Sequence, residues 1–274
     1  MIYKNGYLVK ALYKGASPVK NVFKGSNLVF GNNEPVIECD NVLSFTLYGG
    51  TSYNFTINNN VYSTDSEHIT TIDEGNRIYR YTITLEELGI TDFTNAVSMF
   101  SPPDVQYVYL QEVNSLPCTN NVISMAAMFR SCGHLTSINL NIDTSNVTTL
   151  SQMFDYCGAL SNVDLSSFNT SKVRSLSYMF RNCYMINQLD LSSFNTSKVT
   201  TISYMFDACM SLTTLNVSGW DISNIGTYTN TFRNCSKLTS LIIGDVTQEQ
   251  YDFWYQRLVD AGIQNNVTIT YNLI

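Results

Sequence analysis

The sequence predicts an α/β solenoid, in which units of about 26 residues each contribute a short strand and a helical segment and stack on one another. The stretch DLSSFNTSKV occurs at Asp164–Val173 and again, letter for letter, at Asp190–Val199. A Met-Phe pair, replaced by Thr-Phe at its last position, recurs at nearly the same interval; its members are Phe100, Phe129, Phe154, Phe180, Phe206 and Phe232. An L-x-x-L-x-L pattern follows each pair from Phe129 onward in constant phase. One strand and one helical segment cannot close a core, so neighbouring units must stack.

Each unit contains a predicted strand and a predicted helix. Apolar residues alternate at the end of L-x-x-L-x-L, as at Leu215 and Val217, which predicts a short strand with one buried face. The apolar stripe of a helix is formed by Val199, Ile202, Met205, Phe206 and Cys209. The period and the L-x-x-L-x-L element are those of leucine-rich repeats, which we assign to residues 96–245.

Residues 1–30 contain a shorter repeat of ten residues that predicts an antiparallel β-meander. An aromatic residue precedes a lysine in each unit, at Tyr3 and Lys4, Tyr13 and Lys14, and Phe23 and Lys24. Thirty residues cannot bury enough surface to be stable alone, so this segment must pack on a neighbour. We therefore expect it to dock the protein on a partner or on further copies of itself. Solvated lysines that protect strand edges from aggregation are the other interpretation.

Further elements close the two ends of the predicted stack. Residues 31–95 form a small β unit and N-terminal cap, with strand-like runs separated by GG, NNN and DEGN turns. Capping-box spacing at Thr84–Glu87 predicts a short helix. Residues 246–274 form the C-terminal cap, in which Thr247–Gln250 begins a helix in the same way and VTITYNL predicts a closing strand.

The composition limits the classes of partner. Of the 274 residues 44% are hydrophobic, but only 14% are charged, against about 25% in ordinary globular domains. The net charge is -7, although residues 1–30 hold five lysines and no acidic residue. An acidic body disfavours nucleic acid, because phosphate contacts need clustered Lys and Arg. The sequence has neither a signal-peptide pattern nor a run of about 18 apolar residues, so we expect synthesis in the cytoplasm and no membrane insertion.

Two resemblances to known proteins rest on these motifs. The S-Y-M-F-x-x-C, L-x-x-L-D-L and DLSSFNTSKV patterns of residues 96–245 resemble the BspA-like class of leucine-rich repeats. Members of that class are surface proteins of gut and oral bacteria, mycoplasmas and some protists, and they carry an export signal or a lipid anchor. The resemblance therefore implies a role in adhesion. The tandem Y-K-G-x-x-x-V-K units of residues 1–30 resemble N-terminal segments of virion proteins from phages of gut Bacteroidales, including crAss-like phages. This resemblance implies synthesis in the host cytoplasm and release by lysis.

The cysteines and histidines predict neither a metal site nor a cofactor. Five of the seven cysteines share one repeat position, so stacking should place them in a column near the ~5 Å strand spacing. These are Cys132, Cys157, Cys183, Cys209 and Cys235. The chain contains no C-x-x-C pair, and neither His68 nor His134 has ligand spacing. We expect the column to be buried, reduced and apolar in character.

The exposed side of the predicted strands is the candidate binding face, because its mostly uncharged polar residues suit contacts with glycan or protein. The candidates are Tyr107, Tyr109, Asn139, Asn162, Asp164, Gln188, Asp190, Thr214 and Asn216. Plain solvated surface is the other interpretation. Asp164 and Asp190 lie in successive strands, at a spacing near the ~5 Å between the carboxyl groups of retaining glycosidases. The same repeat position also holds asparagine, so we favour a solvated or ligand-facing ladder over catalysis.

These observations predict a non-enzymatic phage virion structural protein, a head or tail fibre or decoration, whose repeats recognise the host surface or partner proteins. Residues 1–30 would join it to other virion proteins or to copies of itself, and we expect a homo-oligomer. A bacterial BspA-like cell-surface adhesin is the alternative, favoured if a leader is encoded upstream of Met1. A polysaccharide-cleaving enzyme is the third hypothesis.

Overall fold

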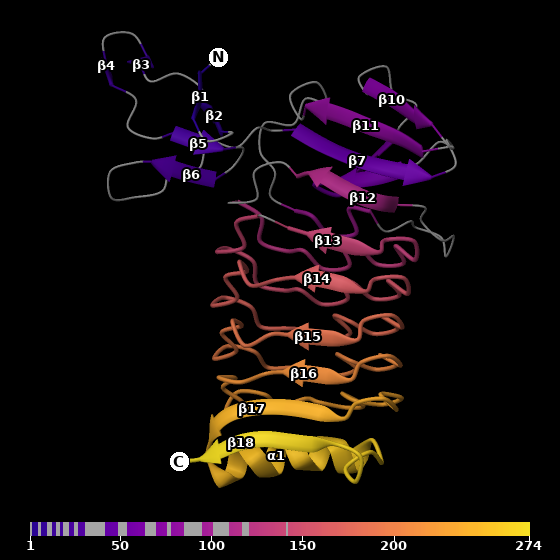
Figure 1. The fold of residues 1–274 in the computed structure, drawn as a ribbon, viewed down its shortest axis with the longest axis vertical. Helices are drawn as coiled ribbons and strands as arrows, with labels where there is room; N and C mark the ends of the chain where they lie inside the picture. Colours follow the sequence, from indigo (N-terminus) through magenta and orange to yellow (C-terminus); the bar gives the residue numbers. More distant parts are fainter. Residues whose placement is uncertain are drawn as a thin grey trace.

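The computed structural model describes residues 121–140 and 142–274 continuously. Of the preceding residues it describes strands β1 to β12, the turn at 58–59, residues 95–100 and residue 116. Figure 1 shows the described coils as one stack, with the C-terminal helix and strand at its lower end.

Five short strands mark successive coils of the repeat region (Figure 1). They are β13 (Ser137–Asn139), β14 (Asn162–Asp164), β15 (Gln188–Asp190), β16 (Thr214–Asn216) and β17 (Ser240–Val246). The pairing is parallel and follows the sequence repeat, with Leu189 opposite Leu215 and Leu215 opposite Leu241. The ladders are β13-β14 and β15-β16-β17-β18, in which β18 (Thr268–Leu273) is the last strand. The predicted solenoid of units of about 26 residues is confirmed.

One apolar core runs along the axis of the stack, because each inward repeat position holds the same kind of side chain in coil after coil. The buried ring column consists of Phe100, Phe129, Phe154, Phe180, Phe206 and Phe232. Successive ring centroids lie 5.4 to 6.1 Å apart and the rings are nearly parallel. Aromatic pairs at this separation add to the stability gained from burial alone. The recurrence of Met-Phe is therefore a packing requirement.

The segment after each strand is a series of tight turns, so the predicted helix in each repeat is wrong. Two residues four apart have positive φ in each of these segments, 61° at Gln152 and 63° at Tyr156 in one coil. The N–H of Phe154 donates to the carbonyl of Met179 in the next coil at 2.9 Å. Bonds between coils thus replace the i to i−4 bonds of a helix. The predicted apolar stripe, which includes Met205, is still buried, because the turns also direct those residues inward.

The C-terminal cap has the predicted helix and strand. Helix α1 (Gln248–Asp260) begins at a capping box, in which Thr247 Oγ1 accepts from the Gln250 N–H and Gln250 Oε1 accepts from the Thr247 N–H. Its buried residue Trp254 lies against the last ring of the phenylalanine column, 6.1 Å from Phe232. The helix therefore closes the open end of the core. Among the described residues, α1 is the one α-helix, and none is long and apolar enough to cross a membrane.

The described N-terminal strands confirm a β-rich region. Residues 1–30 contain three antiparallel hairpins, β1 (Ile2–Lys4) with β2 (Tyr7–Val9), β3 (Tyr13–Lys14) with β4 (Ser17–Pro18), and β5 (Val22–Lys24) with β6 (Asn27–Phe30). A fourth hairpin pairs β8 (Asn54–Ile57) with β9 (Asn60–Ser63). A sheet has the order β10 (Thr70–Gly75), β11 (Ile78–Thr84), β7 (Val42–Tyr48) and β12 (Leu110–Ser115). Thr84, at which the sequence predicts the start of a short helix, is the last residue of β11. Residues 85–87 of that predicted helix lie outside the described residues.

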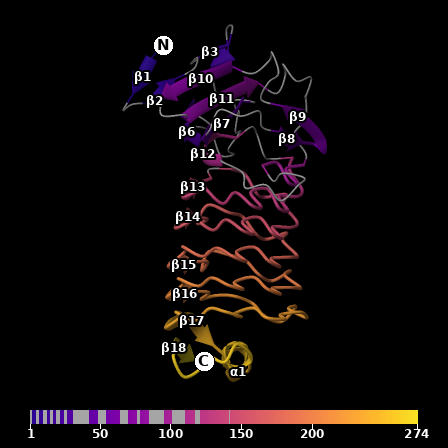
Figure 2. The same cartoon turned by 90° about the vertical axis from the view of Figure 1, so that its right-hand side faces the viewer.

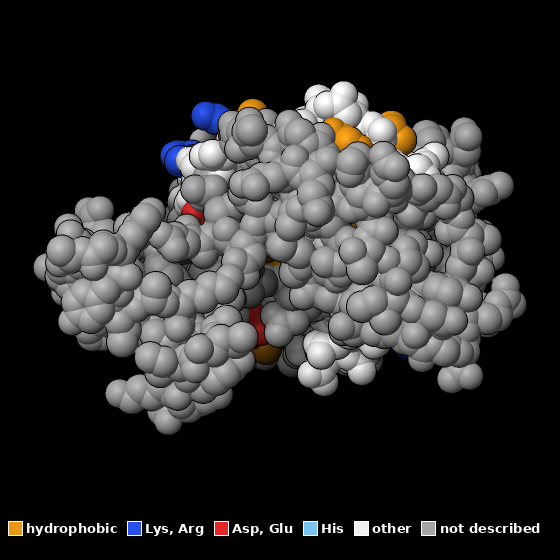
Figure 3. All heavy atoms as spheres, turned by 90° about the horizontal axis from the view of Figure 1, so that it is seen from above, with side chains coloured by type: hydrophobic (Ala, Val, Ile, Leu, Met, Phe, Trp, Pro, Cys, Tyr) orange, Lys and Arg blue, Asp and Glu red, His pale blue; other side chains and the backbone are white. Residues whose placement is uncertain are grey.

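This β region covers the first coil. The ring of Phe45 in β7 meets Phe100 edge-on at 5.4 Å, and the N–H of Thr56 in β8 donates to the Met99 carbonyl at 2.9 Å. Viewed from this end, the described side chains at the surface include hydrophobic, acidic and basic groups in separate positions (Figure 3). Figure 2, turned by 90°, shows the strands along one side of the stack and the turn segments along the other. We name these sides the strand face and the turn face.

Candidate recognition surfaces

The strand face brings most of the predicted binding residues together in axial register. Asn162, Asp164, Gln188 and Asp190 are exposed, while their neighbours in β16, Thr214 and Asn216, are half-buried. Gln188 lies opposite Thr214 and Asp190 opposite Asn216. Asn139 lies in β13, but its side chain is outside the description, and Tyr107 and Tyr109 lie outside the described residues altogether. The same holds for the side chains of Tyr3, Lys4, Tyr13, Lys14, Phe23 and Lys24, whose strands are described.

Asp164 and Asp190 have a structural role that the sequence analysis missed. Asp190 Oδ1 accepts from the Ser192 hydroxyl at 2.7 Å and from the Ser192 N–H at 2.9 Å. Asp164 Oδ1 accepts from the Ser166 N–H at 3.0 Å. These bonds favour the ionised form and lower the pKa of both carboxyl groups, through the Ser192 hydroxyl first at Asp190 and the Ser166 N–H first at Asp164. Each carboxylate forms an Asx turn at the end of its strand, and a lowered pKa is the opposite of what a general acid needs.

A second turn in each coil explains the remainder of DLSSFNTSKV. Asn195 Oδ1 accepts from the hydroxyl of Ser197 at 2.7 Å, in the same Asx arrangement. Buried Thr170 accepts from the Asn195 N–H at 2.7 Å and donates to the Asn195 carbonyl at 3.1 Å. One hydroxyl therefore satisfies two main-chain groups of the next coil. The ten letters recur because both coils that contain them use two Asx turns, a threonine bond to the next coil and a buried phenylalanine, Phe168 or Phe194.

The cysteine column is buried and reduced, as expected. Each thiol lies near the phenylalanine carbonyl of the preceding coil, for example Cys183 Sγ at 3.1 Å from the Phe154 oxygen. Burial raises the pKa of these thiols, and that of Cys235 to about 12. They lack the depressed pKa of a nucleophilic cysteine. Within the described residues, no group of three or more His, Cys, Asp and Glu side chains could hold a metal ion.

A column of alternating charge on the turn face was also missed. The residue after each phenylalanine is Arg130, Asp155, Arg181, Asp207 and Arg233 in successive coils. Arg181 donates from Nε and Nη2 to the two oxygens of Asp155, both at 2.8 Å, and Arg130 Nε lies 3.5 Å from Asp155. The Asp155 side chain is 0% exposed. Burial raises its pKa, against the opposing effect of the two arginines. The sequence does contain a signal for this column, because arginine and aspartate alternate at the position and so repeat every two coils rather than every coil.

Aromatic side chains flank this charge column. The Arg181 guanidinium lies 4.6 Å from the ring of Tyr178 and 5.1 Å from that of Tyr156. The large exposed apolar residues of the turn face are Tyr156, Tyr184, Met185, Met210 and Tyr228. Tyr, Met and Arg are the residue types enriched at the centres of protein interfaces. The turn face is thus a second candidate for recognition, with a different chemistry from the polar strand face.

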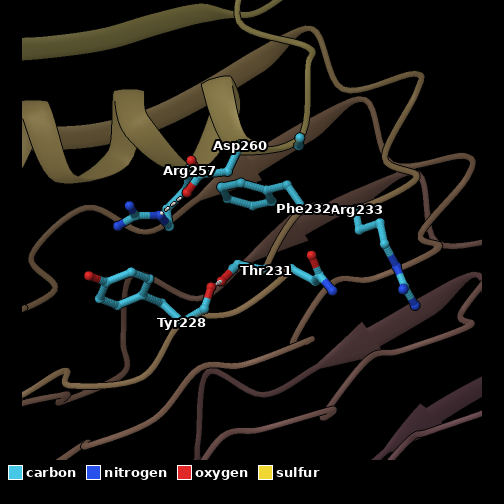
Figure 4. Close-up of a pocket in the computed structure, with 8 residues that line it drawn as sticks. Tyr228, Thr231, Phe232, Arg233, Arg257 and Asp260 are labelled. Carbon is cyan, nitrogen blue, oxygen red and sulfur yellow. Dashed lines mark hydrogen bonds and ion pairs between the residues drawn. The ribbon is translucent and has the colours of Figure 1, made fainter.

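A small pocket between the last coil and α1 serves the cap (Figure 4). The Arg257 guanidinium lies over the Tyr228 ring, with Cζ 3.9 Å from its centroid, and over Phe253 at 4.8 Å. Arg257 Nε also donates to Asp260 at 3.1 Å. The contact of Arg257 with Tyr228 therefore helps to hold α1 on the last coil.

The coils, their period and their L-x-x-L-x-L strands give the chain the architecture of a leucine-rich-repeat solenoid. A family model described as Mycoplasma protein of unknown function, DUF285, matches residues 123–244. Among solved structures, a leucine-rich repeat protein from Bacteroides ovatus matches with 20% identity and a TM-score of 0.34. The match covers 58% of this chain and 36% of that one, so the chain spans little more than a third of that protein's length. No curated protein matches the chain.

Proposed function

We propose that the protein is a non-enzymatic binding protein whose strand face recognises a bacterial surface glycan or a partner protein. The observation that carries this proposal is the exposed row of uncharged polar side chains, such as Asn162 and Gln188, repeated at the coil spacing. Repeated donors and acceptors in axial register suit a repeating polymer. The more reactive groups, Asp155 and the cysteine thiols, are buried in structural contacts.

We further propose a place for the protein in a phage particle, as a head or tail fibre or decoration made in the host cytoplasm. The support is the resemblance of residues 1–30 to N-terminal segments of virion proteins, together with their five lysines and lack of acidic residues. In this proposal residues 1–30 attach to other virion proteins, and the stack projects its faces outward. Sequencing of the flanking genes tests it: portal, capsid and terminase genes support the particle, and a secretion locus contradicts it.

Recognition by the strand face is tested by binding of the labelled full chain to cells and purified surface polysaccharide of gut Bacteroidales. The variant Asn162→Ala/Gln188→Ala removes two exposed amides without touching the core. The matched control Met185→Ala/Met210→Ala removes two exposed side chains of the turn face. We expect at least about a tenfold loss of affinity in the first variant, equivalent to about 1.4 kcal/mol, and little change in the control. Equal binding by the wild type and the first variant would contradict the proposal, and loss only in the control would move recognition to the turn face.

A further inference from the structure

The C-terminal end of the stack carries a strand with an open edge. Among the described strands, β18 is the last of the sheet β15-β16-β17-β18. The N–H of Thr268 donates to Thr239 at 2.8 Å, on the side of β17. Main-chain groups alternate sides along a strand, so those of Ile269, Tyr271 and Leu273 are directed to the opposite edge. That edge is a template for one more strand.

Within the part of the chain that the structure describes, this edge lacks the usual protection. Natural edge strands are guarded by charged residues, proline or a covering segment, whereas residues 263–274 contain neither a charged residue nor proline. Large exposed apolar side chains also gather at this end, and they are Tyr255, Val259, Tyr271, Leu273 and Ile274. The exposed fraction of Leu273 is 56% and that of Ile274 is 82%. An unprotected edge beside an exposed apolar patch indicates an interaction surface.

The charges of the cap select the kind of strand that fits. Residues 245–274 contain four acidic residues and one basic residue, Arg257, which is paired with Asp260. Glu249 and Asp252 are exposed on α1. A twofold pairing of β18 with β18 of another copy would bring these like charges together. A basic strand is the complementary occupant.

We propose that β18 receives a strand from residues 1–30 of a second copy, so that copies associate head to tail. Those residues carry five lysines and no acidic residue, and they form short hairpins in which the first strand ends with an aromatic residue followed by a lysine. Main-chain hydrogen bonds to the open edge of β18 supply affinity. Attraction between the lysines and the acidic residues of the cap, such as Glu249 and Asp252, selects the N-terminal segment as the partner. A head-to-tail contact joins two different surfaces, so it produces an open filament or a ring. The proposal rests on the docking role proposed above for residues 1–30 and names a partner for it.

The test uses two full-length variants that each keep one half of the contact. The head variant, Lys4→Glu/Lys14→Glu/Lys24→Glu, keeps an intact cap. The cap variant, Tyr271→Lys/Leu273→Lys, keeps an intact head and places charge on the open edge. The matched control, Asn224→Lys/Ser236→Lys, adds the same charge at exposed positions of the last coils. Circular dichroism melts establish that all four chains fold.

Sedimentation velocity then measures association. We expect the wild type and the control to form oligomers that weaken by about tenfold or more when salt rises from about 50 mM to 500 mM, because screening removes the charge attraction. Each of the other two variants alone should be monomeric, and their equimolar mixture should form a dimer and nothing larger. Self-association of the head variant alone would show a cap-to-cap contact and overturn the proposal, as would a monomeric wild type or a monomeric mixture.

A charge reversal keeps the test decisive if the head variant associates poorly for another reason. Adding Glu249→Lys/Asp252→Lys to the head variant should restore assembly, and a failure to restore it contradicts the assignment of the acidic cap. The failure of this proposal is separable from that of the proposed function, because the monomeric cap variant retains the strand face. It should still bind bacterial cells as the wild type does.

Discussion

Replacement of Arg181 by methionine tests whether the charge column stabilises the stack. The change removes both 2.8 Å bonds to Asp155, whose side chain is 0% exposed, and leaves Arg130 at 3.5 Å as its remaining basic partner. Removing one member of a buried ion pair costs about 3–5 kcal/mol, because the other charge stays buried. Methionine retains most of the aliphatic volume of arginine, so little of this loss comes from a cavity. We therefore expect the free energy of unfolding of Arg181→Met to fall by about 3–5 kcal/mol at pH 7.

The pH dependence of this loss separates charge burial from packing. The pKa of Asp155 in the folded chain is raised by burial, and the arginines oppose that rise. In Arg181→Met the folded pKa should rise further. A carboxyl group with a raised folded pKa binds its proton more tightly in the native state, so its contribution to stability decreases as pH rises from its ordinary value through its folded value. The difference between variant and wild type should accordingly shrink at acidic pH.

Urea unfolding at pH 7 and at pH 4.5 measures both effects, and amide hydrogen exchange reports which coils open, since stacked repeats need not unfold together. The matched variant is Arg233→Met, because the Arg233 side chain is 51% exposed and Asn234 Nδ2 also lies 3.5 Å from Asp207. We expect it to lose less, about 1–3 kcal/mol. The double variant Asp155→Leu/Arg181→Met should return to within about 1 kcal/mol of the wild type. A loss below about 1 kcal/mol in Arg181→Met, or the same loss at both pH values, would refute the reasoning.

Three further predictions concern the repeat motif. Thr170→Val should lower the free energy of unfolding in urea by about 1–3 kcal/mol, because the Asn195 N–H loses its acceptor; Thr170→Ser keeps the hydroxyl and should lose less, and equal losses would contradict the bridge. Asp190→Asn should make the stability of the chain less dependent on pH in the acidic range. The pKa of Asp190 is lowered in the folded chain, so its carboxylate stabilises the wild type above the ordinary carboxyl pKa, and that stabilisation is lost as pH falls through the folded pKa. An acid titration followed by circular dichroism checks this, and an unchanged pH dependence would exclude the Asx bond as its source. The thiol of Cys183 should react with maleimide only after urea unfolding, because burial raises its pKa, and labelling at Cys183 itself in the native chain, located by peptide mapping, would show that the column is open.

The sequence predicted the period, the strands and the buried columns because each is a local pattern repeated at one interval. Leu189, Leu215 and Leu241 alternate with polar neighbours and repeat at 26 residues, so both the buried face and the stacking follow directly. The connecting segment could not be assigned in the same way. Apolar residues such as Ile202 and Met205 fit a helical stripe, yet turns with positive φ at two residues four apart, Tyr204 and Ala208 in this coil, bury the same residues. Hydrogen bonds between coils decide whether this segment forms a helix or a series of turns, and the spacing of the apolar residues does not report those bonds.

Asn162, Asp164, Gln188 and Asp190 are exposed on their strands, but the sequence analysis missed the structural role of the two acidic residues. Asp190 and Ser192 form an Asx turn whose signal, Asp-x-Ser at the end of a strand, was present in the sequence. The alternating column of Asp155 and Arg181 escaped because its period is two coils, and a search at one coil averages Arg with Asp. Burial of Asp155 depends on how far the turn segment lies from the solvent, which requires the structure.

The two periods of the chain have different consequences for folding. A stack displaced by one coil would keep every phenylalanine on a phenylalanine, every cysteine beneath a carbonyl and DLSSFNTSKV on its copy, so the apolar columns alone specify register weakly. The same displacement would place Arg181 beside arginine and Asp155 beside aspartate, and the loss of the buried Asp155–Arg181 pair alone costs about 3–5 kcal/mol. We infer that the charge column specifies which coil follows which, as a buried polar residue fixes register in coiled coils. The double variant Asp155→Leu/Arg181→Met should therefore be nearly as stable as the wild type yet refold from urea with a lower yield of native chain, measured by gel filtration. Equal yields from the two chains would show that the column contributes stability alone.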